Sequence, residues 1–279
     1  LEFVFDKSFT GKLSQFGLDP NRRTPSGIKA AIIREKGTNG EREMAYMLYL
    51  AGFDVKDVTM TDLISGRETL EDINMVVYCG GFSNSDVLGS AKGWAGSFLF
   101  NPKAKAALDN FYAREDTLSL GVCNGCQLMM ELGLITPEDK KKGKMLHNDS
   151  HKFESNFLGV TVPMNRSVMF GSLSGSKLGI WVAHGEGKFS LPYPEDHYNV
   201  VLKYSYDEYP GNPNGSDYSV AGIASQDGRH LAMMPHLERA CFPWENAYYP
   251  LDRKDEDQIT PWMEAFVNAR KWVEAHKKA

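Results

Sequence analysis

The sequence predicts an α/β fold in which a doubly wound, mostly parallel sheet is flanked by helices and extended by antiparallel strands in its C-terminal half. Two observations support this prediction. Up to about residue 122, short apolar runs alternate with stretches of helical periodicity. After residue 150, shorter strand-like runs follow one another with clusters of turn residues between them. Alternating strands and helices build parallel sheets, whereas strands joined by turns build antiparallel ones.

The first elements alternate as a parallel sheet requires. The run IKAAII (28–33) is apolar, which is typical of a buried strand. In NGEREMAYMLYLAG (39–52), apolar residues recur at helical spacing and Gly52 is a plausible stop. Three strands and one helix are expected next, namely a weak strand at 54–60, a strong one at 73–79, a helix around 103–113 and a strand at 117–122.

The second half of the chain has a different pattern of apolar and turn residues. Its strand-like runs are LGVTVP, IWVAHG, NVVLKYSY, SVAGIAS and HLAMMP, which are expected to extend or flank the sheet. The closing stretch PWMEAFVNARKWVEAHKK (261–278) places four apolar residues at 4-3-4 spacing, which predicts an amphipathic helix packed on the core. These four residues are Trp262, Phe266, Ala269 and Val273.

Bulk composition excludes several classes of protein. The 279 residues carry a formal charge of −5, which argues against a nucleic-acid partner, and no apolar run approaches the roughly 20 residues of a membrane span. Four cysteines are too few for a disulfide scaffold, so we expect a cytoplasmic protein. Residues 1–26 are predicted as a linker or edge segment from a longer chain, with a cloning scar as the alternative, and 27–279 as one domain.

The stretch GVCNGCQ (121–127) contains a C-x-x-C motif that allows three interpretations. A redox dithiol at a strand-to-helix junction would gain reactivity from the helix N-terminus, but it leaves the glycines on either side of Cys123 unexplained. A zinc site needs four ligands, and Cys79 and Cys241 are isolated from each other. A nucleophile elbow, in which only Cys123 is reactive and Cys126 is a packed helix residue, is the most economical interpretation.

The elbow interpretation accounts for the residues around Cys123. Gly121 and Gly125 give the motif the form G-x-nucleophile-x-G, and a sharp turn there leaves no room for Cβ atoms. The helix that follows favours a thiolate, and the amide of Asn124 points to where an oxyanion would form. Both this motif and GGFS (80–83) follow predicted strands, at the edge where parallel sheets bind ligands.

A thiolate nucleophile needs a base and a group that orients it. His236 and Glu238 follow an apolar strand at i and i+2, so that the carboxylate can hold the imidazole. His184 and Glu186 have the same His-x-Glu form. Spacing alone does not separate the two pairs.

Five segments occur here in the same order as in the glutaminase domain of phosphoribosylformylglycinamidine synthases, and the chain resembles that family over roughly residues 27–275. These segments are CGGFSNSD, GVCNGCQ, HNDSHKFE, AHGEGK and MMPHLER. The G-x-C-x-G-x-Q pattern marks triad glutamine amidotransferases in general, and the other segments narrow the resemblance to this family. It implies a flavodoxin-like fold and a domain at 27–279 that releases ammonia from L-glutamine. One departure from the family pattern is Leu237, where relatives often carry Pro.

The resemblance also implies roles for individual residues. Cys123 would be the nucleophile, His236 the base and Glu238 the orienting carboxylate, while AHGEG would be a loop beside the site. The amides of Gly81 and Asn124 would form the oxyanion hole. Glutamine would be held by Gln127, Asn148, Ser150 and Ser83.

The resemblance implies no metal and no cofactor in this domain. ATP and Mg²⁺ would belong to a synthetase portion of the same polypeptide, which would use the ammonia to convert formylglycinamide ribonucleotide in purine biosynthesis. The partners implied are therefore L-glutamine and that synthetase portion.

Overall fold

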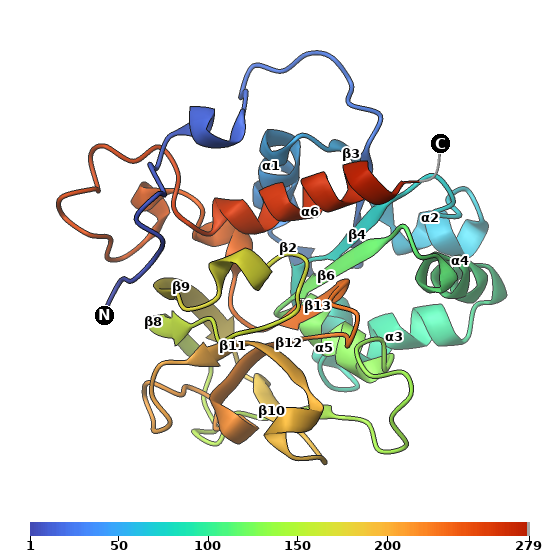
Figure 1. Ribbon diagram of the computed structural model, residues 1–279. Helices are drawn as coiled ribbons and strands as arrows, with labels where there is room; N and C mark the ends of the chain where they lie inside the picture. The colour runs from blue at the N-terminus through green and yellow to red at the C-terminus, as the bar shows by residue number, and fades with distance from the viewer. Residues whose placement is uncertain (278–279) are drawn as a thin grey trace.

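The sheet that organises the molecule has nine strands within the described residues, 1–277, of this computed structural model (Figure 1). Its first five strands run parallel in the order β3, β1, β4, β6, β13. Their bounds are Asp54–Thr59, Lys29–Arg34, Met75–Tyr78, Leu118–Val122 and His230–Met233. If these five strands are renumbered 1 to 5 by their order in the sequence, they lie in the sheet in the order 2-1-3-4-5. This is the flavodoxin-like arrangement, so the predicted fold class is confirmed.

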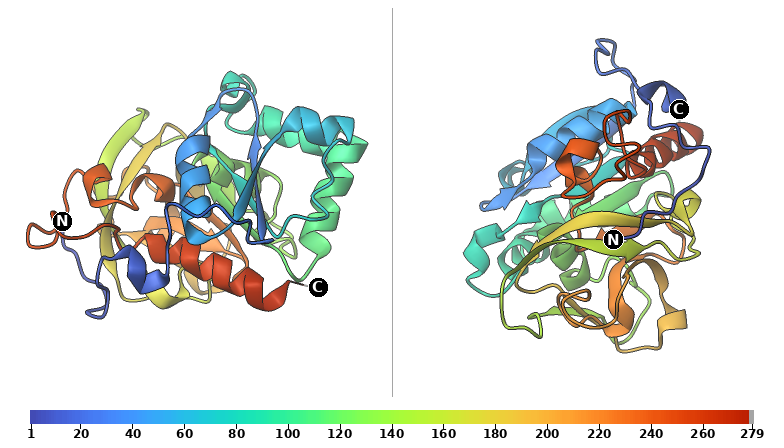
Figure 2. Two further views of the ribbon diagram at one scale, coloured as in Figure 1. Left: turned by 90° about the horizontal axis from the view of Figure 1, so that it is seen from above. Right: turned by 90° about the vertical axis from the view of Figure 1, so that its left-hand side faces the viewer.

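Helices cover both faces of the parallel strands. α1 (Glu41–Ala51) and α6 (Met263–His276) pack side by side on one face, and the other helices gather on the opposite face (Figures 1 and 2). Those are α2 (Met60–Ser65), α3 (Lys92–Leu99), α4 (Pro102–Ala113) and α5 (Asn124–Glu131). α1 ends as predicted at Gly52, whose φ of 108° suits glycine. The closing helix is also confirmed, since all four predicted core residues are buried.

The predicted antiparallel extension is present, with one refinement. β12 (Val220–Ala224), β11 (Asn199–Tyr204), β8 (Glu154–Thr161) and β9 (Lys177–His184) complete the sheet in that order, each antiparallel to its neighbour. β13 instead pairs in parallel with β6, so the second half of the chain also supplies the fifth parallel strand. The segment after β13 is thereby brought next to the segment after β6.

Two short antiparallel pairs of strands lie outside the nine-stranded sheet. β10 (Lys188–Ser190) pairs with β7 (Lys144–Leu146). β2 (Thr38–Asn39) pairs with β5 (Gly80–Gly81). None of the helices within residues 1–277 is long and apolar enough to cross a membrane.

Residues 1–26, predicted as a linker or edge segment, run across the surface of the domain. Val4 forms an isolated bridge with Lys177 on the edge strand β9, and Phe9 is buried. Near the end of the segment, Arg22 donates to the Phe53 carbonyl at 2.6 Å. The segment is thus in contact with the domain at both ends.

A buried hydrogen-bond chain links α4, β6 and β13 at the start of these two strands. Tyr112 donates to the Ser119 hydroxyl at 2.9 Å, and that hydroxyl lies 2.9 Å from His230 Nδ1. Burial lowers the pKa of His230 to about 4, and the charge of Arg229 adds to this effect. His230 is therefore neutral in the folded protein at pH values where an unfolded chain would protonate it.

We expect His230 to make folding stability sensitive to acid. Its folded pKa lies below the unfolded value of about 6.5, so the unfolded state gains the proton first as the pH falls. The free energy of unfolding should lose about 3 kcal/mol through this group between pH 7 and pH 4. Urea denaturation at several pH values should show a smaller acid loss for His230→Gln than for the unchanged protein. Equal losses in the two proteins would contradict this prediction.

Candidate active site

Cys123 occupies a strained turn between β6 and α5. Its backbone has φ 53° and ψ −106°, a conformation that costs free energy in a residue with a side chain. The turn is held by the neighbouring strand, because the Cys123 amide donates to the Met233 carbonyl of β13 at 2.9 Å. A strained residue at the carboxyl edge of a parallel sheet fits the predicted elbow.

The two glycines beside Cys123 are required by close packing. A methyl group on Gly121 would lie 2.5 Å from the Gly125 carbonyl oxygen. On Gly125 it would lie 2.0 Å from the carbonyl oxygen of Tyr78, the last residue of β4. Both distances are far below van der Waals contact, so the prediction that these positions have no room for a Cβ atom is confirmed.

His236 and Glu238 form a buried pair after β13. His236 Nδ1 lies 2.8 Å from Glu238 Oε1, and both side chains are almost fully buried. Burial alone would lower the pKa of His236, but the charge of Glu238 and hydrogen bonds with Cys123 and Glu238 raise it to about 10. Burial alone would raise the pKa of Glu238, but the charge of His236, the hydrogen bond with His236 and the charge of Arg239 together outweigh burial, so the pKa of Glu238 falls. The pair is therefore an imidazolium and a carboxylate at neutral pH.

Gly80 brings this pair and the cysteine together. A methyl group on Gly80 would lie 2.9 Å from His236 Cε1 and 3.4 Å from Cys123 Cβ, so both side chains pack against this residue. Because Nδ1 is engaged by Glu238, Nε2 is the nitrogen left for the sulfur. The structure thus brings Cys123 next to the His236–Glu238 pair.

The rival pair is not formed. His184 Nε2 lies 3.4 Å from Asn214 Nδ2, while His184 Nδ1 is buried without a hydrogen-bond partner. Glu186 instead approaches His147, with 3.9 Å between Oε1 and Nδ1. Burial, assisted by the charge of His236, lowers the pKa of His184 to about 4, so this imidazole is neutral at pH 7.

Cys126 lies inside α5 and is fully buried. Burial raises the pKa of its thiol well above the ordinary value, and the charge of Cys123 adds to this. The four cysteines are free thiols. Within residues 1–277, no group of three or more His, Cys, Asp or Glu side chains is arranged to hold a metal ion.

The two predicted oxyanion-hole amides, those of Asn124 and Gly81, are not used by the elements that contain them. Asn124 is the first residue of α5, where backbone amides have no partner within the helix. Gly81 pairs with Thr38, and the next amide, that of Phe82, donates to the Gly37 carbonyl at 2.8 Å. Because bonded and non-bonded pairs alternate along an antiparallel ladder, the Gly81 amide points away from β2.

The Asn124 side chain connects these two segments. Its Oδ1 accepts from the Ser83 amide at 2.9 Å, and its Nδ2 donates to Gln127 Oε1 at 2.9 Å. Gln127 in turn donates to the Glu186 carbonyl at 2.8 Å. From the sequence, only the backbone amide of Asn124 was predicted to have a role. The role of its side chain could not be predicted, because it depends on a contact with Ser83, which is 41 residues away in the chain.

The cavity in front of Cys123 has a volume of about 190 Å³. This is below the roughly 300–1,000 Å³ of pockets for drug-sized ligands and suits a molecule of amino-acid size. It is formed by residues from four segments of the chain. These are Gly81, Phe82, Asp86, Ser90, Cys123, Gln127, His147, Phe153, Ala183, His184, Gly185 and Glu186.

The residues predicted to hold glutamine are only partly brought together. Gln127 lines the cavity, and Ser83 is buried next to it through its bond to Asn124. Asn148 is fully buried and supports the 184–187 loop, donating to the His184 carbonyl at 2.8 Å and accepting from the Gly187 amide at 2.9 Å. Ser150 lines a separate cavity of about 470 Å³, so the structure does not bring it to Cys123.

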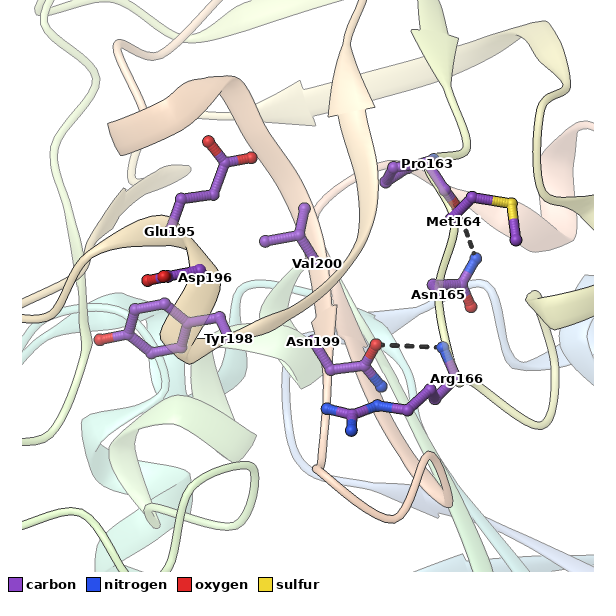
Figure 3. A pocket seen from close by; sticks show the side chains of 9 residues that line it. All are labelled: Pro163, Met164, Asn165, Arg166, Glu195, Asp196, Tyr198, Asn199 and Val200. Atoms are coloured by element: carbon purple, nitrogen blue, oxygen red, sulfur yellow. Dashed lines mark hydrogen bonds between the residues drawn. The ribbon is translucent and has the colours of Figure 1, made fainter.

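A larger cavity of about 610 Å³ lies elsewhere, between residues 163–166 and 195–200 (Figure 3). It includes none of the predicted site residues. Figure 3 shows Asn199 accepting from the Arg166 amide across it, at 3.2 Å. Size alone would therefore not select the cavity that contains Cys123.

A cysteine at a strained elbow, beside a histidine paired with a carboxylate, is the arrangement of triad cysteine hydrolases. Comparison with protein families matches residues 27–273 to the CobB/CobQ-like glutamine amidotransferase domain. The chain belongs to this family.

Two curated relatives illustrate the similarity. The chain is 44% identical over 266 residues to the probable phosphoribosylformylglycinamidine synthase, chloroplastic/mitochondrial, of Arabidopsis thaliana, covering 88% of this chain and 19% of the relative. It is 44% identical over 279 residues to the phosphoribosylformylglycinamidine synthase of Homo sapiens, covering 90% of this chain and 21% of that relative. The chain thus spans about a fifth of the length of these relatives.

Two solved structures share the fold. PurLQS from Thermotoga maritima aligns with a TM-score of 0.62 at 26% identity, covering 89% of this chain and 98% of that one. A glutamine amidotransferase from Thermotoga maritima aligns with a TM-score of 0.52 at 16% identity, covering 89% of this chain and 99% of that one. The second similarity shows the fold alone.

Proposed function

We propose that this chain hydrolyses L-glutamine to glutamate and ammonia through Cys123, His236 and Glu238. The observation that carries the proposal is the junction at Gly80, where a cysteine on a strained elbow meets a buried imidazolium–carboxylate pair. Membership of the glutamine amidotransferase family supports glutamine as the substrate. The small cavity in front of the sulfur is consistent with an amino-acid ligand.

The first half of the proposed reaction forms a thioester. The Cys123 thiolate adds to the carbon of the side-chain amide, and the amides of Gly81 and Asn124 stabilise the oxyanion. The His236 imidazolium gives its proton to the departing nitrogen, so the C–N bond breaks and ammonia leaves. The negative charge of Glu238 stabilises the imidazolium before that transfer.

The second half releases glutamate. Neutral His236 takes a proton from a water molecule, and the resulting hydroxide attacks the thioester carbonyl. The same two amides stabilise the second tetrahedral intermediate, and its collapse breaks the C–S bond. Cys123 returns to a thiolate and His236 to an imidazolium.

We also propose that the ammonia is used by a synthetase portion of the same polypeptide. The curated relatives are about five times longer than this chain and are named phosphoribosylformylglycinamidine synthases, which supports a ligase role in purine biosynthesis. ATP and Mg²⁺ would bind in that portion. The exposed apolar side chains of Val87 and Leu88, close to the cavity residues Asp86 and Ser90, offer a contact surface for it. A cytoplasmic location remains a prediction.

Covalent labelling tests the proposal. The chloroketone analogue of L-glutamine should form one adduct at Cys123, found by mass spectrometry of the digested protein, and excess L-glutamine should slow the labelling. Failure to label Cys123, or equal labelling of Cys126, would contradict the proposed mechanism. Another triad amidotransferase with a different ammonia acceptor would label in the same way, and assays of the full polypeptide with a panel of acceptors would distinguish it.

A further inference from the structure

Arg239 places a positive charge beside Glu238 and takes no part in the proposed chemical steps. It ends the short turn Leu237–Arg239 that follows β13. Its Nη2 donates to Asn39 Oδ1 at 2.9 Å, across 200 positions of the chain. Its Nε lies 3.8 Å from Glu238 Oε1 and 3.9 Å from Glu43 Oε1 on α1. One guanidinium thus links its own segment to two others.

The bond to Asn39 reaches the strand pair that carries part of the site. Asn39 lies in β2, opposite Gly80 of β5. Gly80 is the residue on which Cys123 and His236 both pack, and Gly81 next to it supplies one of the two proposed oxyanion-hole amides. A shift of the β2–β5 pair would therefore move an oxyanion donor relative to the nucleophile and the base.

The β2–β5 pair has little support from the rest of the sheet. Each of its strands has two residues, and the pair lies outside the nine-stranded sheet. Two strands alone are marginally stable at best. The backbone bond next to the pair, from the Phe82 amide to the Gly37 carbonyl at 2.8 Å, joins the loop before β2 to the turn after β5. The bond from Arg239 to Asn39 joins β2 to the segment that carries His236.

Burial of Glu238 fixes the other end of this link. Glu238 is 1% exposed; its Oε1 lies 2.8 Å from His236 Nδ1, and its Oε2 accepts no hydrogen bond. A buried carboxylate needs positive charge nearby, and Arg239 supplies it together with His236. A methyl group on Gly40 would lie 3.2 Å from Glu238 Oε1 and 3.3 Å from Arg239 Nη2, so the chain between β2 and α1 packs directly on this ion pair. Attraction to Glu238 thus holds the guanidinium where it meets Asn39.

We propose that Arg239 is a positioning residue that ties the β2–β5 pair, through Asn39, to the segment that carries His236. A guanidinium presents its N–H donors in a rigid, planar fork, so it can face a carboxylate and an amide oxygen at once. Its role is to keep the Gly81 amide where the oxyanion forms, and Arg239 itself does not line the cavity of Cys123. This assignment rests on the proposed glutaminase function.

The test compares Asn39→Ala, Arg239→Gln and the double variant, using the full chain. Each single variant should lower kcat for L-glutamine hydrolysis about 10- to 100-fold with only a few-fold change in KM. The reason is that a misplaced oxyanion donor weakens binding of the transition state more than binding of the substrate. The double variant should be no slower than the slower single variant, because either change breaks the same bond.

Alkylation of Cys123 by iodoacetamide separates this role from general damage to the site. The reaction needs the thiolate but forms no oxyanion, so its rate should be unchanged in Asn39→Ala, which keeps the charge of Arg239. Glu43→Gln is the matched control, because Glu43 is an exposed residue that approaches the same guanidinium at 3.9 Å. An exposed ion pair of this kind contributes little, so kcat should be unchanged in this variant.

Other outcomes would overturn the assignment. Unchanged kcat in Asn39→Ala, or single losses that multiply in the double variant, would show that the bond does not position the site. Equal losses of hydrolysis and alkylation in Asn39→Ala would mean that the bond supports the fold of the whole site. A loss in Glu43→Gln as large as in Asn39→Ala would assign the effect to the guanidinium in general and not to its bond with Asn39.

Failure of the proposed function can be told apart from failure of this assignment. If the unmodified protein neither hydrolyses glutamine nor labels at Cys123, the function fails and the assignment fails with it. Equal hydrolysis by the unmodified protein and Asn39→Ala refutes the assignment alone. Asn39 is exposed, so thermal melting should show that Asn39→Ala folds normally, and the test stays decisive even if Arg239→Gln does not fold.

Discussion

Replacing Cys123 with alanine should reduce glutamine hydrolysis at least about 10³-fold, and losses near 10⁶ are known for nucleophiles that act within a triad. The sulfur is the only group in the cavity that can form the thioester, and His236 and Glu238 have no bond-forming role without it. The initial rate of ammonia release, measured with saturating L-glutamine, checks this. Substrate binding should survive, because the variant keeps the rest of the cavity.

Cys126→Ala is the matched control for that variant. Cys126 is as buried as Cys123 and only three residues away, but it lies inside α5. Its loss should lower the free energy of unfolding by about 1–2 kcal/mol through a small cavity and leave kcat within a few-fold. Equal loss of activity in both variants would instead favour a redox dithiol.

Replacing Glu238 with glutamine should lower kcat/KM roughly 10²–10⁴-fold. The amide keeps the size of the side chain but removes the charge that raises the pKa of His236 to about 10. Burial then lowers this pKa with only the contribution of Cys123 to oppose it, so the imidazolium proposed to protonate the leaving nitrogen is lost at a lower pH. The alkaline limb of the pH profile of kcat/KM should therefore shift to lower pH.

Alkylation of Cys123 by iodoacetamide gives a second readout of this change. The thiolate is the reactive form of a cysteine and a neighbouring imidazolium stabilises it, so the rate of alkylation should fall in Glu238→Gln. Glu245→Gln is a suitable control, since Glu245 is a nearby carboxylate that accepts from the Phe242 amide at 3.1 Å. An unchanged pH profile in Glu238→Gln would show that Glu238 only fills space.

Much of the fold could be predicted because its signals are local. Apolar runs of four to six residues mark β1, β4 and β6, and Gly52 ends α1 where only a left-handed residue fits. The parallel pairing of β13 was not predicted, because a short apolar run carries no information about its partner. That pairing is what brings His236 to Cys123.

The site was predictable where chemistry depends on adjacent residues. The glycines of the elbow are needed because carbonyl groups lie too close to leave room for a Cβ atom. The spacing G-x-C-x-G shows this requirement in the sequence itself. The choice between His184 and His236 was open from spacing alone, since both have the form His-x-Glu.

The sequence by itself therefore determined most of the strands, the closing helix, the elbow around Cys123 and the candidate histidines. Those features follow from periodicity, turn chemistry and steric limits within a few residues. Only the tertiary structure decided which histidine has a carboxylate partner and which cysteine reaches a cavity. These outcomes depend on burial and electrostatics between segments up to about a hundred residues apart, and such contacts exist only once the sheet has formed.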